Sequence, residues 1–514
     1  MRNRSVSLAL AVVCLFVPSL AGAGQRQLTV DDIYDPAKKV NFDGDVPRLA
    51  WSPDGESLVR ANMDPQKGDL GLRRVDPASG NESPYLDAAR FEKAVTTLAG
   101  ISPAEAREIA HGVSFTFNGA GTALLFDHDD DIYLYDAAAG RVARLTSAPG
   151  EKLNASFSPD GRMVAYVRDG NLYTVDCATG RDRQLTTDGG PNHLNGHLGW
   201  VYEEELYGRG DTTGYWWSPD STRLAYLSLD ETVVPEFVLT DDRTIPQTVE
   251  RTRYPQAGDP NPGVRLGVVS TGGGETDWVD LSEYAPADTL VVRVCWSPDG
   301  KNVVYQVQNR TQSWLDLNAS PAAGGAPLHL LREESRFWVD AIDNPTWLAD
   351  GSFLWQSDRT GYRHIYHCGA DGKLVGALTS GDWDVRSLYG VSRDGWIYFQ
   401  AAEHSPIADH VYRVKTDGTG FTRLTDVEGN HTAVFNPACT LFLDYSSTVA
   451  TPTKLRLRDG AGKVVRVVSD NPVAALAEFS LGAPEFLKVP TRDGFVMEAM
   501  MIKPPNFDPS KKYP

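Results

Sequence analysis

Phe157-Ser158-Pro159-Asp160-Gly161, followed by the apolar run Met163–Val167, is the stretch on which the fold of this chain depends. In this five-residue unit proline fixes φ, aspartate bonds to its own backbone and glycine adopts a positive φ. Together they predict a tight turn between two antiparallel strands. Apolar residues at successive positions after the turn indicate a strand that is buried on both faces.

The same unit recurs along the chain. Close copies start at Trp51, Trp217 and Trp296, and degenerate copies start at Phe117, Trp347, Val391 and Phe435. A further strand with a Leu/Ile/Val-Tyr pair, such as Leu172-Tyr173, comes about 14 residues on. Eight units with a plain spacing of 40 to 44 residues predict an all-β fold, an eight-bladed β-propeller over residues 47–475. A β-sandwich, the structural alternative, would not repeat this signature.

The spacing between units also locates the insertions. Excess length lies between the first and second units, between the third and fourth, and above all between the fourth and fifth. The last of these includes residues 228–263, a hydrophobic segment that contains Pro235 and Pro255. Loops of this length inside a compact domain are usually functional, so we expect a role for this segment.

The N-terminus differs in character from the repeats. Arg2 and Arg4 precede an apolar run from Val6 to Leu20, and small residues follow at positions 21–23. This pattern predicts a secretory signal peptide over residues 1–23, and hence a secreted or periplasmic protein. A membrane anchor would need about 20 apolar residues, whereas this run is shorter and is interrupted by a proline. Residues 24–46 are then a lead-in segment before the propeller.

The charge balance narrows the range of partners. Without the two arginines of residues 1–23, 47 of the 49 basic side chains remain against 68 acidic ones, a formal net charge of −21. Such a surface repels nucleic acid and anionic lipid, so we expect neither as a partner, and no membrane association after signal cleavage.

No cofactor or metal site is predicted. Beyond the signal segment the cysteines are Cys177, Cys295, Cys368 and Cys439, which form no CxxC pair. Spacing alone does not assign a disulfide among them. The acidic run Asp127–Asp131 is typical of a polar hairpin turn, because it directly precedes the Ile-Tyr pair of a predicted blade strand.

One acidic cluster does suggest a binding site. Glu203, Glu204 and Glu205 are adjacent in the insertion of the third interval, and aromatic residues flank them on both sides. Adjacent carboxylates repel one another, and a surface helix gains little from stacking them. A substrate ammonium removed from water would need such acceptors. From spacing alone, a solvated acidic run, an ammonium site and a metal-cation site all remain open.

At this point the chain resembles a known family, the propeller of dipeptidyl peptidase IV and its bacterial relatives in the prolyl oligopeptidase clan. The resemblance covers essentially the whole chain beyond residue 23. It depends on Trp200–Glu205, Gly214–Pro219, Tyr254–Gly258 with Asn261-Pro262, Gly361–Ile365 and Phe507–Pro514.

The resemblance implies a secreted serine peptidase that removes dipeptides, typically with proline or alanine second, from the free N-termini of peptides. In that family the last two glutamates of the triple hold the α-amino group, which implies this role for Glu204 and Glu205. Glu203, Tyr202 and Trp200 are candidate supporting residues, and Glu203 is expected to be structural. By analogy, residues 228–263 form the arm of a homodimer.

No catalytic residue is assigned. In the family the serine, aspartate and histidine belong to an α/β-hydrolase domain, and residues 476–514, with a hairpin around Asp493-Gly494, resemble only the truncated start of that domain. The best match to a Gly-x-Ser-x-Gly elbow is Gly390–Asp394, whose last position is wrong. Arg90 and Arg107 are arginines of the first insertion, but neither matches a motif for binding a substrate carbonyl. We therefore expect no turnover by this chain alone.

Two alternative functions remain open from the sequence. One is a free-standing propeller used for protein interaction, and the other is the propeller of an oligopeptidase or acylaminoacyl peptidase. The C-terminal hairpin argues against the first, since a finished propeller does not need it. The glutamate triple argues against the second, because an endopeptidase needs no clamp for a free amino group.

Overall fold

The computed structural model describes residues 25–62, 71–113, 115–425 and 428–513, and the predicted signal peptide lies outside them. The described chain forms two compact units. The larger contains residues 46–447 and 454–470, and the smaller contains residues up to 45, 448–453 and 471 onward. The predicted domain boundaries stay predictions.

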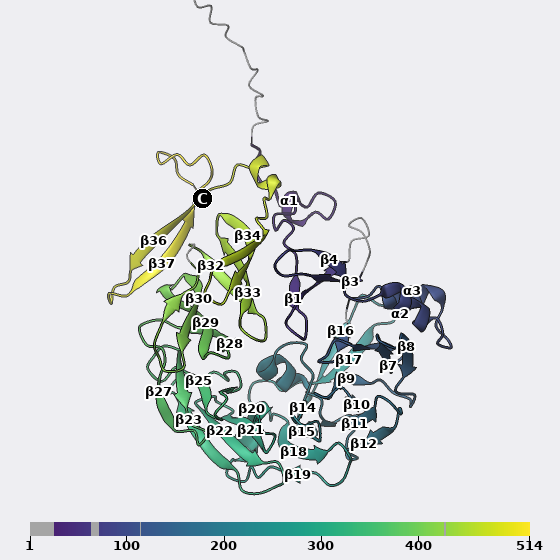
Figure 1. The fold of residues 1–514 in the computed structure, drawn as a ribbon. Coiled ribbons are helices and arrows are strands. Elements are labelled where there is room, and N and C mark those ends of the chain that lie inside the picture. Colours follow the sequence, from purple (N-terminus) through teal and green to yellow (C-terminus); the bar gives the residue numbers. More distant parts are fainter. Residues whose placement is uncertain (1–24, 63–70, 114, 426–427, 514) are drawn as a thin grey trace, which may run out of the picture. The chain divides into compact units, whose positions relative to one another are not determined.

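The larger unit is the predicted eight-bladed β-propeller. Its blades are eight separate antiparallel sheets that follow one another in chain order (Figure 1). In seven of the blades the strands are hydrogen-bonded in sequence order, so each of these is a simple meander, whereas in blade 4 both β13 and β14 pair with β15. The all-β prediction is confirmed, and the eight repeats found in the sequence correspond to eight sheets.

The first four blades have the following strands. Blade 1 contains β1 (Leu49–Trp51), β2 (Leu58–Asn62), β3 (Gly71–Val75) and β4 (Glu82–Pro84). Blade 2 contains β5 (Thr116–Phe117), β6 (Ala123–His128), β7 (Asp131–Asp136) and β8 (Arg141–Arg144). Blade 3 contains β9 (Leu153–Phe157), β10 (Met163–Arg168), β11 (Asn171–Asp176) and β12 (Asp182–Gln184). Blade 4 contains β13 (His193–Asn195), β14 (Tyr215–Trp217), β15 (Arg223–Asp230), β18 (Gly263–Ser270) and β19 (Asp277–Trp278).

The other four blades complete the ring. Blade 5 contains β20 (Thr289–Trp296), β21 (Asn302–Asn309), β22 (Trp314–Pro321) and β23 (Leu328–Glu334). Blade 6 contains β24 (Thr346–Trp347), β25 (Phe353–Ser357), β26 (His364–Cys368) and β27 (Leu374–Ala377). Blade 7 contains β28 (Val385–Val391), β29 (Trp396–Ser405), β30 (Ala408–Lys415) and β31 (Thr422–Arg423). Blade 8 contains β32 (Asn430–Phe435), β33 (Leu441–Thr448), β34 (Thr451–Asp459) and β35 (Val464–Ser469).

The repeated turn forms as its chemistry predicts. In blade 3 the hydroxyl of Ser158 donates to Asp160 at 2.6 Å and accepts from the backbone N–H of Met163 at 3.0 Å. Gly161 has a φ of 71°, which glycine adopts without strain. The degenerate unit at Val391 makes the same bond, from Ser392 to Asp394 at 2.6 Å. Local turn chemistry therefore explains the repeat.

Blades 2, 3, 7 and 8 contain stacked aromatic pairs on neighbouring strands. Tyr166 of β10 pairs with Tyr173 of β11, and their rings stack with centroids 5.2 Å apart. Tyr173 belongs to the Leu-Tyr pair identified in the sequence, which lies on the third strand of its blade. The ring closes between blades 1 and 8, where the indole of Trp51 donates to Val434 at 2.9 Å and Arg466 donates to Pro77 at 2.9 Å.

Three insertions decorate the propeller. Between blades 1 and 2 lie the helices α2 (Ala88–Val95) and α3 (Pro103–Ala110). Between β13 and β14 of blade 4 lies a π-helix, η2 (Val201–Tyr207), and between β15 and β18 lies a hairpin of β16 (Glu236–Asp241) and β17 (Thr248–Arg253). A short 3-10 helix, η3 (Pro286–Asp288), precedes blade 5. The hairpin is the segment predicted at residues 228–263.

The smaller unit joins the two ends of the described chain. Helix α1 (Val30–Tyr34) is capped by Thr29, and Arg26 forms an isolated bridge with Phe479, just after the 3-10 helix η4 (Ala474–Glu478). The C-terminal hairpin predicted from the sequence is present as β36 (Pro484–Pro490) and β37 (Val496–Ile502). Its assignment to a peptidase domain stays a prediction.

Three further observations concern the described residues only. Their four cysteines are all free thiols. They contain no group of three or more histidine, cysteine, aspartate or glutamate side chains arranged to hold a metal ion. None of their helices is long and apolar enough to cross a membrane.

Candidate functional site

The glutamate triple lies on the π-helix η2 of blade 4. Val201, Tyr202 and Leu206 are buried and anchor the helix in the core, while the carboxylates occupy its other side. The helix ends where the backbone N–H of Gly208 donates to the carbonyl of Glu203 at 2.9 Å, and Gly208 has a φ of 120°. A single π-helical turn of this kind is rare and is frequently found at functional sites.

The three carboxylates have different surroundings. Glu203 accepts a hydrogen bond from the backbone N–H of Gly210 at 3.0 Å, so it anchors the loop that follows the helix to η2. Glu204 pairs with Nε of Arg209 at 2.7 Å, and the Glu204 side chain is 20% exposed whereas that of Arg209 is 84% exposed. The hydrogen bond to Glu204 raises the pKa of Arg209. Glu205 is exposed and, within the described part of the chain, has no ion pair or hydrogen bond through its side chain.

Glu205 lines a cavity of about 390 Å³. The cavity walls come from η2, from the segment after β17, from β20, from the turn between β21 and β22, and from the loop after β23. The lining residues are Trp200, Val201, Glu205, Leu206, Tyr254, Pro255, Gln256, Ala257, Asn261, Leu290, Arg310, Gln312 and Trp338. Glu204 is not among them, although it is the next residue along the helix.

Two of the sequence motifs meet at this cavity, and a third packs against η2. The ring of Trp200 meets that of Tyr254 at 4.2 Å, which joins the glutamate motif to the Tyr254–Gly258 motif. Tyr254 also contacts Phe237 of β16 at 5.5 Å, so the base of the inserted hairpin supports the same wall. From the Gly214–Pro219 motif, Trp216 packs against Tyr207 at 5.9 Å.

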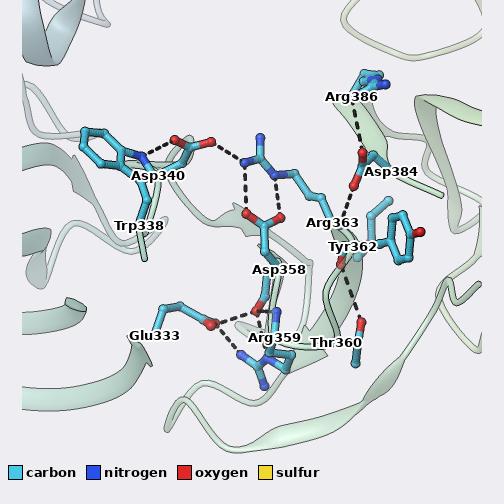
Figure 2. Close-up of polar contacts among 12 residues, drawn as sticks. Glu333, Trp338, Asp340, Asp358, Arg359, Thr360, Tyr362, Arg363, Asp384 and Arg386 are labelled. Carbon is cyan, nitrogen blue, oxygen red and sulfur yellow. Dashed lines mark hydrogen bonds and ion pairs between the residues drawn. The ribbon is translucent and has the colours of Figure 1, made fainter. Parts of the chain in front are cut away.

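The Gly361–Ile365 motif contributes through an ion-pair chain. Arg363 pairs with Asp340 at 2.6 Å, and Asp340 accepts a hydrogen bond from the indole of Trp338 at 2.7 Å (Figure 2). Trp338 lines the cavity, so this motif acts on the cavity through a residue that the sequence did not single out. Arg359, next to the motif, instead pairs with Glu333.

Several residues of the site were missed by sequence reasoning. Arg209 comes shortly after the glutamates in the sequence, and its positive charge could have indicated that it pairs with one of them. Arg310, Gln312 and Trp338 lie in blade 5 loops that no motif marks. The two arginines of the first insertion do not line the cavity: Arg90 donates to the carbonyls of Ala137 and Ala138 at 2.9 Å, and Arg107 is exposed on α3.

Comparison with known proteins decides the family. The family described as "Dipeptidyl peptidase IV (DPP IV) N-terminal region" matches residues 121–453. This chain belongs to the DPP IV N-terminal region family. The match covers most of the propeller, including η2, the inserted hairpin and the Arg363 motif.

Curated relatives of this DPP IV-type propeller are named as dipeptidyl peptidases or dipeptidyl-aminopeptidases. Dipeptidyl peptidase 4 of Trichophyton equinum is 27% identical over 347 residues, which are 64% of this chain and 44% of the relative. Probable dipeptidyl-aminopeptidase B of Emericella nidulans is 28% identical over 363 residues, 64% of this chain and 39% of the relative. The chain thus spans less than half the length of these relatives.

Solved structures agree with the DPP IV assignment. The crystal structure of Porphyromonas gingivalis dipeptidyl peptidase 4 has a TM-score of 0.83 and 27% identity, and the match covers 96% of this chain and 69% of that one. A putative dipeptidyl aminopeptidase IV from Bacteroides ovatus has a TM-score of 0.75 at 21% identity and supports the fold alone.

Proposed function

We propose that this propeller binds the free N-terminus of peptide substrates for a serine dipeptidyl peptidase, with Glu204 and Glu205 as acceptors for the α-ammonium group. The observation that carries the proposal is Glu205, a carboxylate without an ion-pair partner in the described chain, on the wall of a cavity with aromatic sides. An ammonium group leaving water needs a negative charge and hydrogen-bond acceptors, and Glu205 offers both.

Glu204 supplies the second acceptor. Both of its oxygens lie near Nε of Arg209, at 2.7 and 3.0 Å, but a carboxylate has about four acceptor positions and one partner leaves some free. Arg209 is largely exposed, so its pairing with Glu204 is readily exchanged with solvent or shared with a ligand. In this proposal Glu203 holds the loop and does not touch the ligand.

Two glutamates that fix the ammonium group also set the cleavage position. An anchored N-terminus places the bond after the second residue at a constant distance from the anchor, so the product is a dipeptide. The names of the relatives point to the same product. We propose substrates with proline or alanine as the second residue, and a gating role for the propeller in the complete peptidase.

The direct test compares peptides that differ only at the N-terminus. Binding of Ala-Pro-Ala amide and of its N-acetylated form to the 514-residue chain is measured by titration calorimetry. The free amine is expected to bind, and acetylation is expected to abolish measurable binding because the ammonium charge is lost. Equal affinities for the two peptides would contradict the proposal.

We also propose that residues 1–514 do not hydrolyse peptides by themselves. Ser392, in the nearest match to a nucleophile elbow, donates its hydroxyl to Asp394 inside a blade 7 turn, as Ser158 does in blade 3. This serine is therefore a turn residue. A chromogenic X-Pro substrate should remain intact, and turnover that a serine-directed inhibitor stops would refute this point.

The inserted hairpin β16–β17 is proposed as a dimer arm. It is a separate two-stranded sheet, and Val238, Leu239 and Val249 are exposed on it. An isolated hairpin is marginally stable in water, so cover from a second copy would stabilise it. Replacing Val238 and Leu239 with serine should convert dimers to monomers in light scattering, and unchanged mass would count against the arm.

The cellular location is proposed from residues 1–23. We propose export to the periplasm or medium, with cleavage after position 23. Sequencing the N-terminus of protein recovered from the exported fraction checks both points, and protein that retains Met1 in the cytoplasm would refute them.

A further inference from the structure

Trp338 is exposed but firmly oriented. It follows strand β23 and is 56% exposed, although it lines the cavity that contains Glu205. Its indole N–H donates to Oδ1 of Asp340 at 2.7 Å, which fixes one edge of the ring. A large aromatic surface left open to a cavity and held in one orientation is suited to contact with a ligand.

The orientation of Trp338 depends on a chain of three charged groups, which we call the Arg363 relay: Asp340, Arg363 and Asp358. The guanidinium of Arg363 donates to Oδ2 of Asp340 at 2.6 Å and to Oδ1 of Asp358 at 3.0 Å (Figure 2). The backbone N–H of Arg363 donates to Asp384 at 2.9 Å, which fixes the start of the arginine itself. Asp340 and Arg363 are thus each held by more than one partner.

Asp340 and Arg363 remain charged near neutral pH. Burial acts to raise the pKa of Asp340, but the hydrogen bonds from Arg363 and Trp338 outweigh it and hold that pKa below its usual value. Burial acts to lower the pKa of Arg363, but Asp358 and Asp340 raise it overall. Charge-assisted bonds to a planar guanidinium are stronger and more directional than bonds to a lysine.

We infer that Trp338 selects the side chain of the first substrate residue, and that Arg363 positions Trp338 for this contact. The inference rests on the proposed binding of the ammonium group at Glu205. The first side chain leaves the same Cα as that ammonium group, so it must lie against a wall of the same cavity. With Trp338, Trp200, Tyr254 and Leu290 in those walls, aromatic and large apolar side chains are favoured.

The size of the preference follows from ring contacts. An aromatic pair contributes about 0.5–1.5 kcal/mol beyond burial of its area, which corresponds to roughly 2- to 12-fold in affinity. We therefore expect Phe-Pro-Ala amide to bind more tightly than Gly-Pro-Ala amide, by at least this factor. Trp338→Ala should remove most of the difference, and Trp338→Phe should retain a large part of it.

The positioning role of Arg363 is tested separately. Arg363→Gln should weaken binding of Phe-Pro-Ala amide several-fold and leave Gly-Pro-Ala amide nearly unchanged, because only the ring contact is lost. Arg363→Lys keeps the positive charge but loses the planar, two-pronged guanidinium group. It should therefore give an intermediate ratio of the affinities for the two peptides. Tyr362→Ala, which alters the neighbouring exposed side chain outside the cavity lining, is the matched control and should leave the ratio unchanged.

The outcomes separate this inference from the proposed function. If Glu205→Gln leaves the affinity of both peptides unchanged, the ammonium site itself is wrong. If Glu205→Gln weakens both peptides but Trp338→Ala leaves their ratio unchanged, only the selectivity inference fails. If Trp338→Ala alters the ratio but Arg363→Gln acts equally on both peptides, or only lowers the melting temperature, Arg363 is structural and its positioning role is refuted.

Discussion

Blades 3 and 4 are neighbours built from the same repeat, but they differ in what is added to it. Blade 3 is a plain four-stranded meander, β9 to β12. Blade 4 has a fifth strand, the π-helix η2 and the hairpin β16–β17 inserted between its strands. The plain blade has its repeated residues in turns and core, whereas the decorated blade supplies residues to the cavity around Glu205.

This difference indicates that the stability of the propeller and its binding of peptides depend on different residues. Ring packing requires only the repeated strands, so loops between them are free to carry other chemistry. Changes in a plain blade should therefore alter the free energy of unfolding without altering peptide affinity at matched folded concentration. Changes of exposed side chains in the insertions of blade 4 should do the reverse.

The largest effect is expected in blade 3. Tyr166 is fully buried, stacks on Tyr173 and donates to Asp182 at 2.7 Å. Tyr166→Ala should lower the free energy of unfolding by about 3–5 kcal/mol, as for other large-to-small core changes. Tyr166→Phe, the control, should lose only the hydrogen bond. Chemical denaturation measures the stability of both variants. A large loss of peptide affinity in the folded Tyr166→Ala variant would contradict the separation of stability from binding.

A second plain blade, blade 7, should make stability depend on pH. His410 is buried, its Nδ1 lies 2.9 Å from Thr425, and its Nε2 has no hydrogen-bond partner among the described residues. Burial lowers the pKa of His410 to about 4, and repulsion from His431, Arg423 and His404 adds to this, while Asp444 opposes it. In the unfolded chain this pKa returns to about 6.5.

The direction of this pH dependence follows from proton binding. Between pH 6.5 and 4 the unfolded state binds a proton at His410 that the folded state does not, so stability falls as the pH falls through this window. The loss is at most about 3 kcal/mol. Denaturation at several pH values measures it, and His410→Gln should flatten that part of the profile. An unchanged profile in the variant would show that His410 does not cause the dependence.

In blade 4 the corresponding prediction concerns binding. Glu205→Gln should weaken binding of Ala-Pro-Ala amide roughly 10- to 100-fold, because a hydrogen bond to a charged group contributes about 1.5–3 kcal/mol. Its melting temperature should not change, since the side chain is exposed. Glu203→Gln is the matched control: it keeps an oxygen for the N–H of Gly210 and should preserve affinity. If both variants lose affinity equally, the triple acts only as a diffuse negative field.

The same comparison shows how much the sequence can predict. The blades were predictable because their signal is local: in five of the eight turns a Ser-to-Asp bond joins residues two apart, including the degenerate copy at Val391. The C-terminal hairpin was predictable for the same reason. The glutamates were found because three adjacent carboxylates between aromatic residues are unusual.

The walls of the cavity were not predictable in this way. Arg310 and Trp338 reach the site from loops of blade 5, about a hundred residues or more from the glutamates, and no short pattern encodes which loops of a ring converge. The role of Arg363 was hidden for the same reason. Its motif was visible in the sequence, but Asp340 and Trp338, through which it reaches the cavity, carry no motif.

The smallest expected effect tests whether the backbone of η2 matters for binding. Gly208 ends this helix with a φ of 120°, and a Cβ there would meet no atom within 4 Å, so Gly208→Ala acts through backbone strain alone. We expect a loss of about 1 kcal/mol in stability, together with a few-fold loss of peptide affinity as the helix end relaxes. Gly351 in blade 6 also has a positive φ and open space, and it does not line the Glu205 cavity. Gly351→Ala should therefore lose similar stability but no affinity, and equal losses of affinity in both variants would show that general loosening, not the geometry of η2, controls binding.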